Sequence, residues 1–151
     1  MKKADWDEYF LEIAHSVAKY STCKQRQVGA VLVKDKQILA TGYNGAPFNL
    51  RNCLELGCLK EENQIPIGVG KGHESCRAVH AEQNIIIQCA LYGISTRDAI
   101  IYCNYSPCVA CAKMLINAEI SRIVVYKEYP DKVYRKLFKQ AGIVVNFIQK
   151  Y

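Results

Sequence analysis

Two stretches decide how this chain is interpreted: His80-Ala81-Glu82 and Pro107-Cys108-Val109-Ala110-Cys111. One imidazole and two thiolates can hold a zinc ion on three sides and leave its fourth position for a water molecule. That open position distinguishes catalytic zinc from structural zinc, which has four protein ligands. We therefore predict a catalytic zinc site formed by His80, Cys108 and Cys111, beside which Glu82 stays free of the metal and moves protons.

Both stretches stand at the start of predicted helices. His80 and Glu82 would share one first turn, and Cys108 and Cys111 would lie one turn apart on the same side of the other helix. The positive ends of the two helix dipoles favour ionised thiolates. The alternative is a structural zinc with a fourth protein ligand, and the neighbouring carboxylate favours the open site.

The rest of the sequence alternates between patterns typical of helices and of strands. Apolar spacing predicts helices, with Asp5 as an N-cap and with Gly93 and Gly142 as C-caps. The expected helices cover 5–20, 80–92, 108–119 and 133–140. The expected strands cover 28–33, 37–43, 99–105, 123–126 and 143–148, the first two forming a hairpin. This order predicts an α/β fold with a partly parallel sheet covered by helices on both faces.

The composition is that of one globular domain over 1–151, since the 151 residues are half apolar with a formal net charge of +6. No apolar run approaches the ~20 residues that span a bilayer, and residues 1–6 show no signal-peptide core. Eight cysteines could indicate a disulfide scaffold, but the Cys108–Cys111 spacing favours metal binding in a reducing compartment. We expect a cytoplasmic protein without a membrane partner, in which Cys89 and Cys103 are buried apolar residues.

Residues 44–79 form a long segment that is rich in Gly, Pro, Asn and Cys and has no sustained period. Loops beyond ~12–15 residues in compact domains are usually functional or disordered. This segment carries Cys53, Cys58, His73 and Cys76, so we expect that it is held in place by its own contacts.

At these residues the chain resembles the cytidine deaminase superfamily and, within it, the deoxycytidylate (dCMP) deaminases, including the bacterial late-competence members. The resemblance covers nearly the whole chain and includes Ser21-Thr22-Cys23, Val28-Gly29-Ala30-Val31-Leu32-Val33, Gly42-Tyr43-Asn44-Gly45-Ala46-Pro47, Asn52-Cys53, His80-Ala81-Glu82-Gln83-Asn84 and Ser106-Pro107-Cys108. It implies a three-layer α/β/α domain with a five-stranded mixed sheet. It also implies zinc-dependent hydrolysis of dCMP to dUMP and ammonia, which feeds thymidylate synthesis.

The resemblance also assigns roles to single residues. It makes His80, Cys108 and Cys111 the zinc ligands and Glu82 the proton shuttle. Asn44 would contact the sugar hydroxyl, although Asn-Gly is also a common turn pair. Further substrate contacts are expected from Ala81, Arg26, Ser106 and Tyr129. Charged donors distinguish a nucleotide from a nucleoside, so we expect the phosphate to meet two or three of Lys24, Arg26, Arg51 and Tyr129.

Some phage and bacterial members of the family carry a second, structural zinc that ties the long insertion to the first turn of the sheet. Here such a site would use Cys23, Cys53, His73 and Cys76. Cys58 could replace one of them. A closed tetrahedral zinc orders an irregular loop. Buried free cysteines are the alternative, and Ala78 stands where the phage form has a carboxylate ligand.

The resemblance further implies a hexamer that dCTP activates and dTTP inhibits, with the 42–45 turn in the effector region. The rival enzymes are a free-nucleoside cytidine deaminase, a tRNA adenosine deaminase and a guanine deaminase. A zinc-stabilised nucleic-acid-binding module of a competence system would explain the charge and the cysteines, but not Glu82. The basic residues are scattered and form no track for a strand, so we do not expect nucleic acid as a partner.

Overall fold

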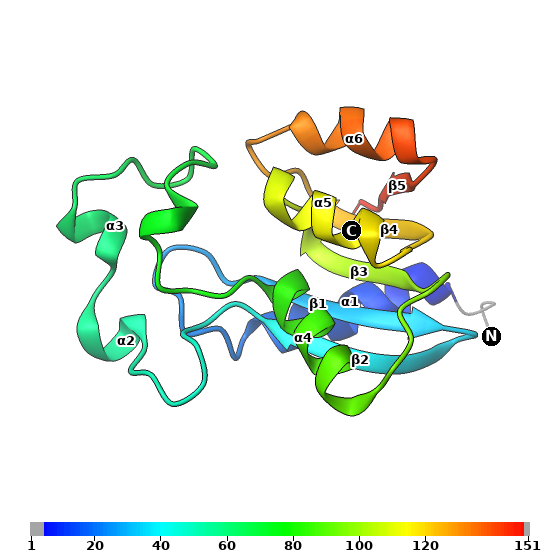
Figure 1. Cartoon of the computed structure of the whole chain (residues 1–151), viewed down its shortest axis with the longest axis horizontal. Helices are drawn as coiled ribbons and strands as arrows, with labels where there is room; N and C mark the ends of the chain where they lie inside the picture. The colour runs from blue at the N-terminus through cyan, green and yellow to red at the C-terminus, as the bar shows by residue number, and fades with distance from the viewer. Residues whose placement is uncertain (1–4, 150–151) are drawn as a thin grey trace.

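The computed structural model describes residues 5–149, in which a five-stranded mixed sheet lies between two layers of helices (Figure 1). The strand order is β2 (Gln37–Tyr43), β1 (Gly29–Lys34), β3 (Ile100–Tyr105), β4 (Arg122–Lys127) and β5 (Val144–Phe147). β1 is antiparallel to β2 and to β3, whereas β3, β4 and β5 are parallel. The predicted three-layer α/β/α architecture is confirmed.

The hairpin between β1 and β2 turns at Asp35 and Lys36, whose φ angles are 50° and 61°. Positive φ at both central residues is the geometry of a two-residue turn that matches the twist of the strands. Lys34, which the sequence placed in the turn, is the last residue of β1.

One face of the sheet is covered by α1 (Trp6–Ala18), which the Asp5 carboxylate caps by accepting from the backbone N–H of Asp7 and Glu8. Its apolar side packs against alternate residues of β1, β3 and β4. This core consists of Phe10, Leu11, Ala14, Val31, Val33, Tyr102 and Val124. Residues 1–4, where we expected no signal-peptide core, lie outside the described part of the chain.

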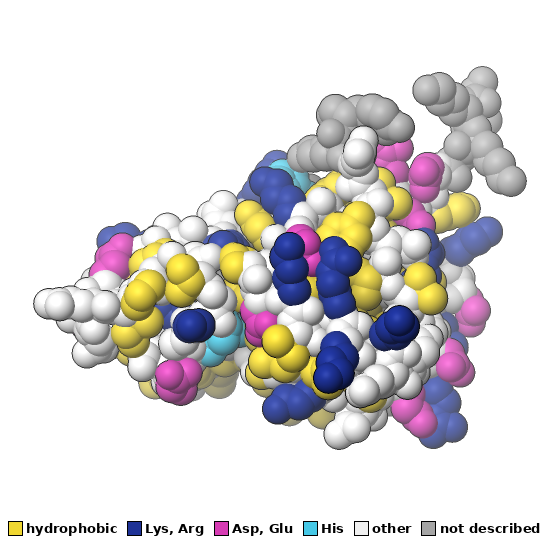
Figure 2. Space-filling view, turned by 90° about the horizontal axis from the view of Figure 1, so that it is seen from above, with side chains coloured by type: hydrophobic (Ala, Val, Ile, Leu, Met, Phe, Trp, Pro, Cys, Tyr) yellow, Lys and Arg dark blue, Asp and Glu magenta, His cyan; other side chains and the backbone are white. Residues whose placement is uncertain are grey.

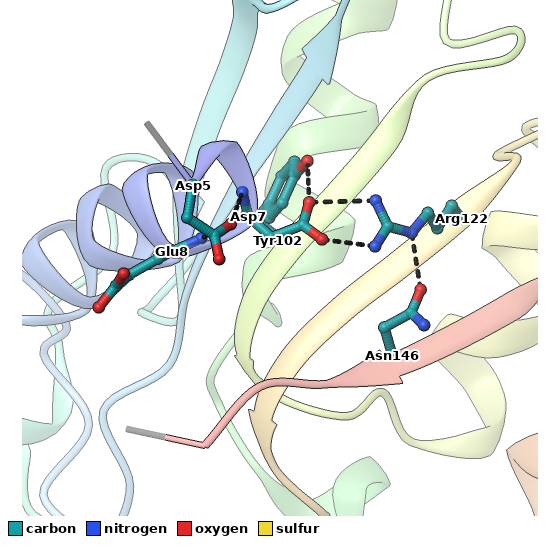
Figure 3. A network of polar contacts seen from close by, with 6 residues as sticks. All are labelled: Asp5, Asp7, Glu8, Tyr102, Arg122 and Asn146. Carbon is teal, nitrogen blue, oxygen red and sulfur yellow. Dashed lines mark hydrogen bonds and ion pairs between the residues drawn. The ribbon is translucent and has the colours of Figure 1, made fainter. Parts of the chain in front are cut away.

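The N-terminal end of α1 is also joined to the sheet by a polar network (Figure 3). The Asp7 carboxylate accepts from the Tyr102 hydroxyl at 2.9 Å and from two nitrogens of Arg122 at 3.0 and 2.5 Å. Arg122 Nε also donates to Asn146 Oδ1 at 2.6 Å. A carboxylate with a bidentate guanidinium is among the stronger polar contacts, so α1, β3, β4 and β5 are held in one arrangement.

The other face carries α4 (Ala81–Tyr92), α5 (Val109–Asn117) and α6 (Val133–Ala141), which cover the larger core. α5 and α6 are the crossovers that parallel strands require. Gly42 of β2 lets α4 approach closely, because a Cβ there would lie 2.4 Å from the Ala81 carbonyl oxygen. α4 ends at Gly93, whose φ of 66° is the left-handed cap that we predicted.

The insertion extends from the end of the sheet as a separate lobe (Figure 1). Its ends meet at a bridge between Gly45 and Val79. It contains α2 (Cys53–Leu56), α3 (Leu59–Glu62) and the 3₁₀ turn η1 (His73–Ser75), three short elements in the segment where the sequence shows no sustained period. A four-residue helix is too short to show a helical period in the sequence. None of the helices within residues 5–149 is both long enough and apolar enough to cross a membrane.

Candidate metal and active site

His80, Cys108 and Cys111 come together where α4 and α5 begin. His80 Nδ1 lies 3.5 Å from Cys108 Sγ and 3.3 Å from Cys111 Sγ. A tetrahedral zinc with ordinary Zn–N and Zn–S bonds separates such donors by roughly 3.5 Å, so the residues fit the ion. Within residues 5–149, no other group of three or more His, Cys, Asp or Glu side chains brings its ligand atoms as close together.

The local sequence explains why His80, Cys108 and Cys111 come together. His80 and Cys108 are the N-cap residues of α4 and α5, one position before the helical turns in which we had placed them. An extended N-cap residue turns its side chain across the helix end, and Cys111 follows in the first turn of α5. The His80 N–H donates to Gln83 Oε1 at 2.8 Å, which fixes the backbone of the histidine.

The two thiols differ in acidity. A hydrogen bond from the Cys111 thiol, together with one from His80, lowers the pKa of Cys108 to about 4, although burial opposes this. The same hydrogen bond to Cys108 raises the pKa of Cys111. Burial alone would lower the pKa of His80, but hydrogen bonding to Cys108 and the charge of Glu82 raise it. The hydrogen bonds of the site therefore favour ionisation of Cys108, and a cation at the centre would favour ionisation of both thiols.

Glu82 lies in the first turn of α4, only 5% exposed, next to the metal cluster but not part of it. Burial raises the pKa of its carboxyl group, while the charge of His80 lowers it. The Cys111 thiol lies within hydrogen-bonding reach of the carboxylate. A buried carboxylate of raised pKa beside a metal site can serve both as proton acceptor and as proton donor.

A pocket of about 130 Å³ opens onto the cluster. It is lined by all five predicted substrate contacts, Asn44, Ala81, Arg26, Ser106 and Tyr129. Of the other predicted phosphate ligands, Arg51 instead pairs with Glu55 on the surface of α2, and Lys24 lines a different cleft. Sequence reasoning missed Lys60 and Arg77, which line the pocket from the irregular insertion and follow no recognisable spacing.

The Asn44 side chain is buried and largely engaged by the protein. Its Oδ1 accepts from Ser21 Oγ at 2.5 Å and from the Val28 N–H at 2.8 Å, and its Nδ2 donates to the Arg26 carbonyl at 2.8 Å. An amide nitrogen carries two hydrogens, so one remains for a ligand. Asn44 thus holds the segment that carries Arg26 and also faces the pocket.

Aromatic rings hold Arg26 in place. Its guanidinium lies 5.0 Å from the centre of the Tyr105 ring and 4.8 Å from that of Tyr129. The Tyr129 hydroxyl lies 3.3 Å from His73 Nε2, and the His73 ring meets the His80 ring edge-on at 4.8 Å. The segments that carry His73 and Tyr129, which are distant in the sequence, therefore contact each other at the pocket.

The cysteines predicted to bind a second metal partly gather around Cys53. Burial raises the pKa of its thiol, and the charges of Cys23, Cys76 and Cys58 raise it further, whereas Arg77 lowers it. His73 lies against His80 and Tyr129, so the structure places it at the catalytic pocket. Cys58, which we expected only as a substitute, is among the thiols whose charge acts on Cys53.

Comparison with known proteins identifies the family of this chain. The model of the cytidine and deoxycytidylate deaminase zinc-binding region matches residues 4–127. The chain belongs to this family. ComE operon protein 2 of Bacillus subtilis is 35% identical over 150 residues, a match that covers 99% of this chain and 74% of that protein. The deoxycytidylate deaminase of Saccharomyces cerevisiae is 33% identical over 146 residues; the match covers 96% of this chain but only 45% of the yeast protein.

A solved structure is similar over the whole fold. The dCMP deaminase of cyanophage S-TIM5, in complex with dCMP and dUMP, superposes with a TM-score of 0.78 at 26% identity. The match covers 98% of this chain and all of the phage chain. The matched region of the family model, residues 4–127, includes His80, Cys108 and Cys111.

Proposed function

We propose that this protein is a cytoplasmic, zinc-dependent enzyme that hydrolyses dCMP to dUMP and ammonia. The observation that carries the proposal is the three-ligand cluster of His80, Cys108 and Cys111 with the buried Glu82 beside it. The phage relative that superposes over the full fold binds both dCMP and dUMP, which differ by this reaction. Zinc held by the cluster would polarise a water molecule for attack on C4 of the cytosine ring.

In this proposal Glu82 moves the protons. Its carboxylate takes a proton from the attacking water, delivers it to N3 of the ring, and a further transfer completes the departing ammonia. Glu82 and Cys111 are buried, so the transfer would take place beneath the protein surface. Asn44 would donate its remaining amide hydrogen to the sugar, with Ala81 and Ser106 forming the wall behind the base.

Arg26 is our candidate for the 5′-phosphate. It lines the pocket, its guanidinium is fixed by two tyrosine rings, and none of the five ion pairs among the described residues uses it. A cation that is held in place without a carboxylate partner is prepared to meet an anionic ligand. Lys60 and Arg77 bring two more positive charges to the same pocket.

Arg26→Gln is expected to raise KM for dCMP by about tenfold or more, because a charged hydrogen bond contributes about 1.5–3 kcal/mol. The low turnover of deoxycytidine, which has no phosphate, should stay unchanged. Ammonia release from dCMP, CMP and deoxycytidine measures both. Arg51→Gln is the matched control, since Arg51 lies outside the pocket, and it should behave as wild type. Equal turnover of dCMP and deoxycytidine by the wild-type protein would refute the nucleotide assignment and favour a nucleoside deaminase.

We also propose a second, structural zinc held by Cys23, Cys53, Cys58 and Cys76. All four thiols line the pocket wall between the 21–27 segment and the insertion. Gln25 already hydrogen-bonds to Glu61 across the same boundary. The thiols lie farther apart than those of the catalytic cluster, so the metal would draw the two segments together.

The wild-type protein should then contain about two zinc ions per chain, and Cys53→Ser about one. Metal analysis of the purified protein by mass spectrometry measures this. Cys89→Ser removes a buried thiol of α4 that belongs to neither set of proposed zinc ligands, and it should keep both ions. A single zinc per fully loaded wild-type chain would eliminate the second site.

Assembly and regulation are proposed from the resemblance together with one surface feature. Tyr43 on β2 and Ile87, Leu91 and Tyr92 on α4 are large apolar side chains that are exposed, which supports burial against further copies of the chain. We propose a hexamer with dCTP and dTTP as effectors. Sedimentation with and without each nucleotide tests it, and a monomer under all conditions would contradict the assembly.

A further inference from the structure

A second cleft lies beside the catalytic pocket and shares Cys23, Gln25, Arg26 and Tyr105 with it. We call it the basic cleft. Its other walls are the end of α1, the ends of β3 and β4, Leu54 and Gln149, and its volume is about 1190 Å³.

The charged side chains that line this cleft are positive. Lys19, Lys24, Arg26 and Lys127 line it, and no Asp or Glu does. None of the five ion pairs within residues 5–149 involves any of these four cations. Carboxylates do act on one lining residue: burial raises the pKa of Tyr126, and the charges of Glu12 and Glu8 on α1 raise it further.

Two of the cations are held on an aromatic ring. Arg26 and Lys127 lie 5.0 and 5.8 Å from the centre of the Tyr105 ring. Such cation–π contacts orient a cation without neutralising it. The positive charge of the cleft is therefore left for a ligand to balance.

The fold gathers residues that are scattered along the chain. Lys19 follows the last turn of α1, Arg26 precedes β1 and Lys127 ends β4. The carboxyl ends of parallel strands are the usual place for ligands in α/β folds, and β3 and β4 both end at this cleft. In the folded protein, therefore, cations from distant segments line one cleft, although the linear sequence shows no such grouping.

We propose that the basic cleft binds the sugar–phosphate backbone of single-stranded nucleic acid. Such sites follow the strand with a positively charged groove, and Lys19, Lys24, Arg26 and Lys127 supply the charges here. The volume exceeds the roughly 300–1,000 Å³ of ordinary small-molecule pockets, which favours a ligand longer than one nucleotide. This binding goes beyond deamination of dCMP, and of the four cations only Arg26 also lines the catalytic pocket.

A second group of basic side chains, outside the basic cleft, provides the control for the experiment. Lys and Arg side chains also gather on the face seen from above, the side of α6 (Figure 2). There Lys132 and Arg135 both pair with Glu128, and α6 offers an exposed helical surface. Exposed Lys113 on α5 and Lys136 on α6 lie outside both clefts and serve as controls for net charge.

The test is fluorescence anisotropy of a labelled 12-residue oligothymidylate with the zinc-loaded full chain over a range of salt. If three or four phosphates are contacted, the logarithm of the binding constant should fall with that of the salt concentration with a slope of about −2 to −3. Lys19→Gln/Lys127→Gln should weaken binding by about tenfold or more and reduce the slope by about 1.4. Lys113→Gln/Lys136→Gln, with the same change in charge, should bind within about twofold of wild type, and both double variants should turn over dCMP normally, which shows that they are folded.

Equal weakening by the two double variants would overturn the proposal, because the attraction would then follow net charge alone. Binding of a nucleoside triphosphate without binding of the oligonucleotide would also overturn it and indicate a small polyphosphate ligand. Glu82→Gln should bind the oligonucleotide as wild type does. A protein that binds the strand but leaves dCMP intact would therefore refute the proposed enzyme activity and not this site.

Discussion

Glu82→Gln is expected to lower kcat for dCMP by about three orders of magnitude or more while zinc stays bound. General acid–base catalysis by a positioned side chain contributes about 10²–10⁴-fold, and here one carboxylate serves both the attacking water and the leaving group. Glutamine has nearly the same shape and can occupy the same buried position at the start of α4, but it cannot accept a proton. The measurement is dUMP formation together with zinc content.

Glu12→Gln is the matched control, because Glu12 is exposed on α1 on the other side of the sheet. It should keep the wild-type rate. Substantial activity in Glu82→Gln, above about a tenth of wild type, would remove the proton-transfer role. Loss of zinc from Glu82→Gln would show instead that the carboxylate supports the metal site.

Cys108→Ala is expected to lose the catalytic zinc and, with it, all measurable activity. The variant removes one of the three ligand atoms, from the thiol whose pKa hydrogen bonds from Cys111 and His80 lower to about 4. Two remaining ligands bind zinc far more weakly than three, because each additional ligand of a preformed site adds to the affinity. Zinc content and dUMP formation should therefore fall together.

Cys89→Ala tests whether the effect comes from the metal or from a lost buried thiol. Cys89 lies on α4 and is 2% exposed, comparable with Cys108 at 4%, but it does not belong to the cluster. It should keep zinc and activity, apart from some loss of stability. Retention of full zinc content by Cys108→Ala would contradict the ligand set.

The effects expected for Glu82→Gln and Cys108→Ala depend on how the fold positions the zinc ligands and Glu82. α4 and α5 begin at the same end of the sheet, so the N-cap residues His80 and Cys108 meet although they are distant in the sequence. Gly42 permits the close packing of α4 on β2 that brings Glu82 to this point. The zinc cluster thus depends on backbone packing at least as much as on the residues that form it.

The sequence predicted best those features that depend on neighbouring residues, such as helix caps and the apolar period. Residue spacing located the four main helices and five strands to within a few residues, because Asp5, Gly93 and Gly142 mark their ends and the apolar period is regular. The two zinc motifs were recognisable because the ligand types and the adjacent carboxylate occur together in a fixed order.

Sequence reasoning failed where partners come from distant segments without a period. The short helices α2 and α3 and the place of His73 at the catalytic pocket could not be read from residues 44–79. Lys24 was expected at the phosphate, but the fold directs it to the basic cleft. The positions of scattered cations in the sequence do not predict a charged surface, because the fold decides which of them lie together.

Anomalous diffraction at the zinc edge, from crystals of the zinc-loaded protein, tests the central claim most directly. The account predicts a peak bonded to His80 Nδ1, Cys108 Sγ and Cys111 Sγ, at about 2.0–2.1 Å from nitrogen and about 2.3 Å from sulfur, with no protein atom in the fourth position. A fourth protein ligand at that position, or no peak between these three residues, would contradict it.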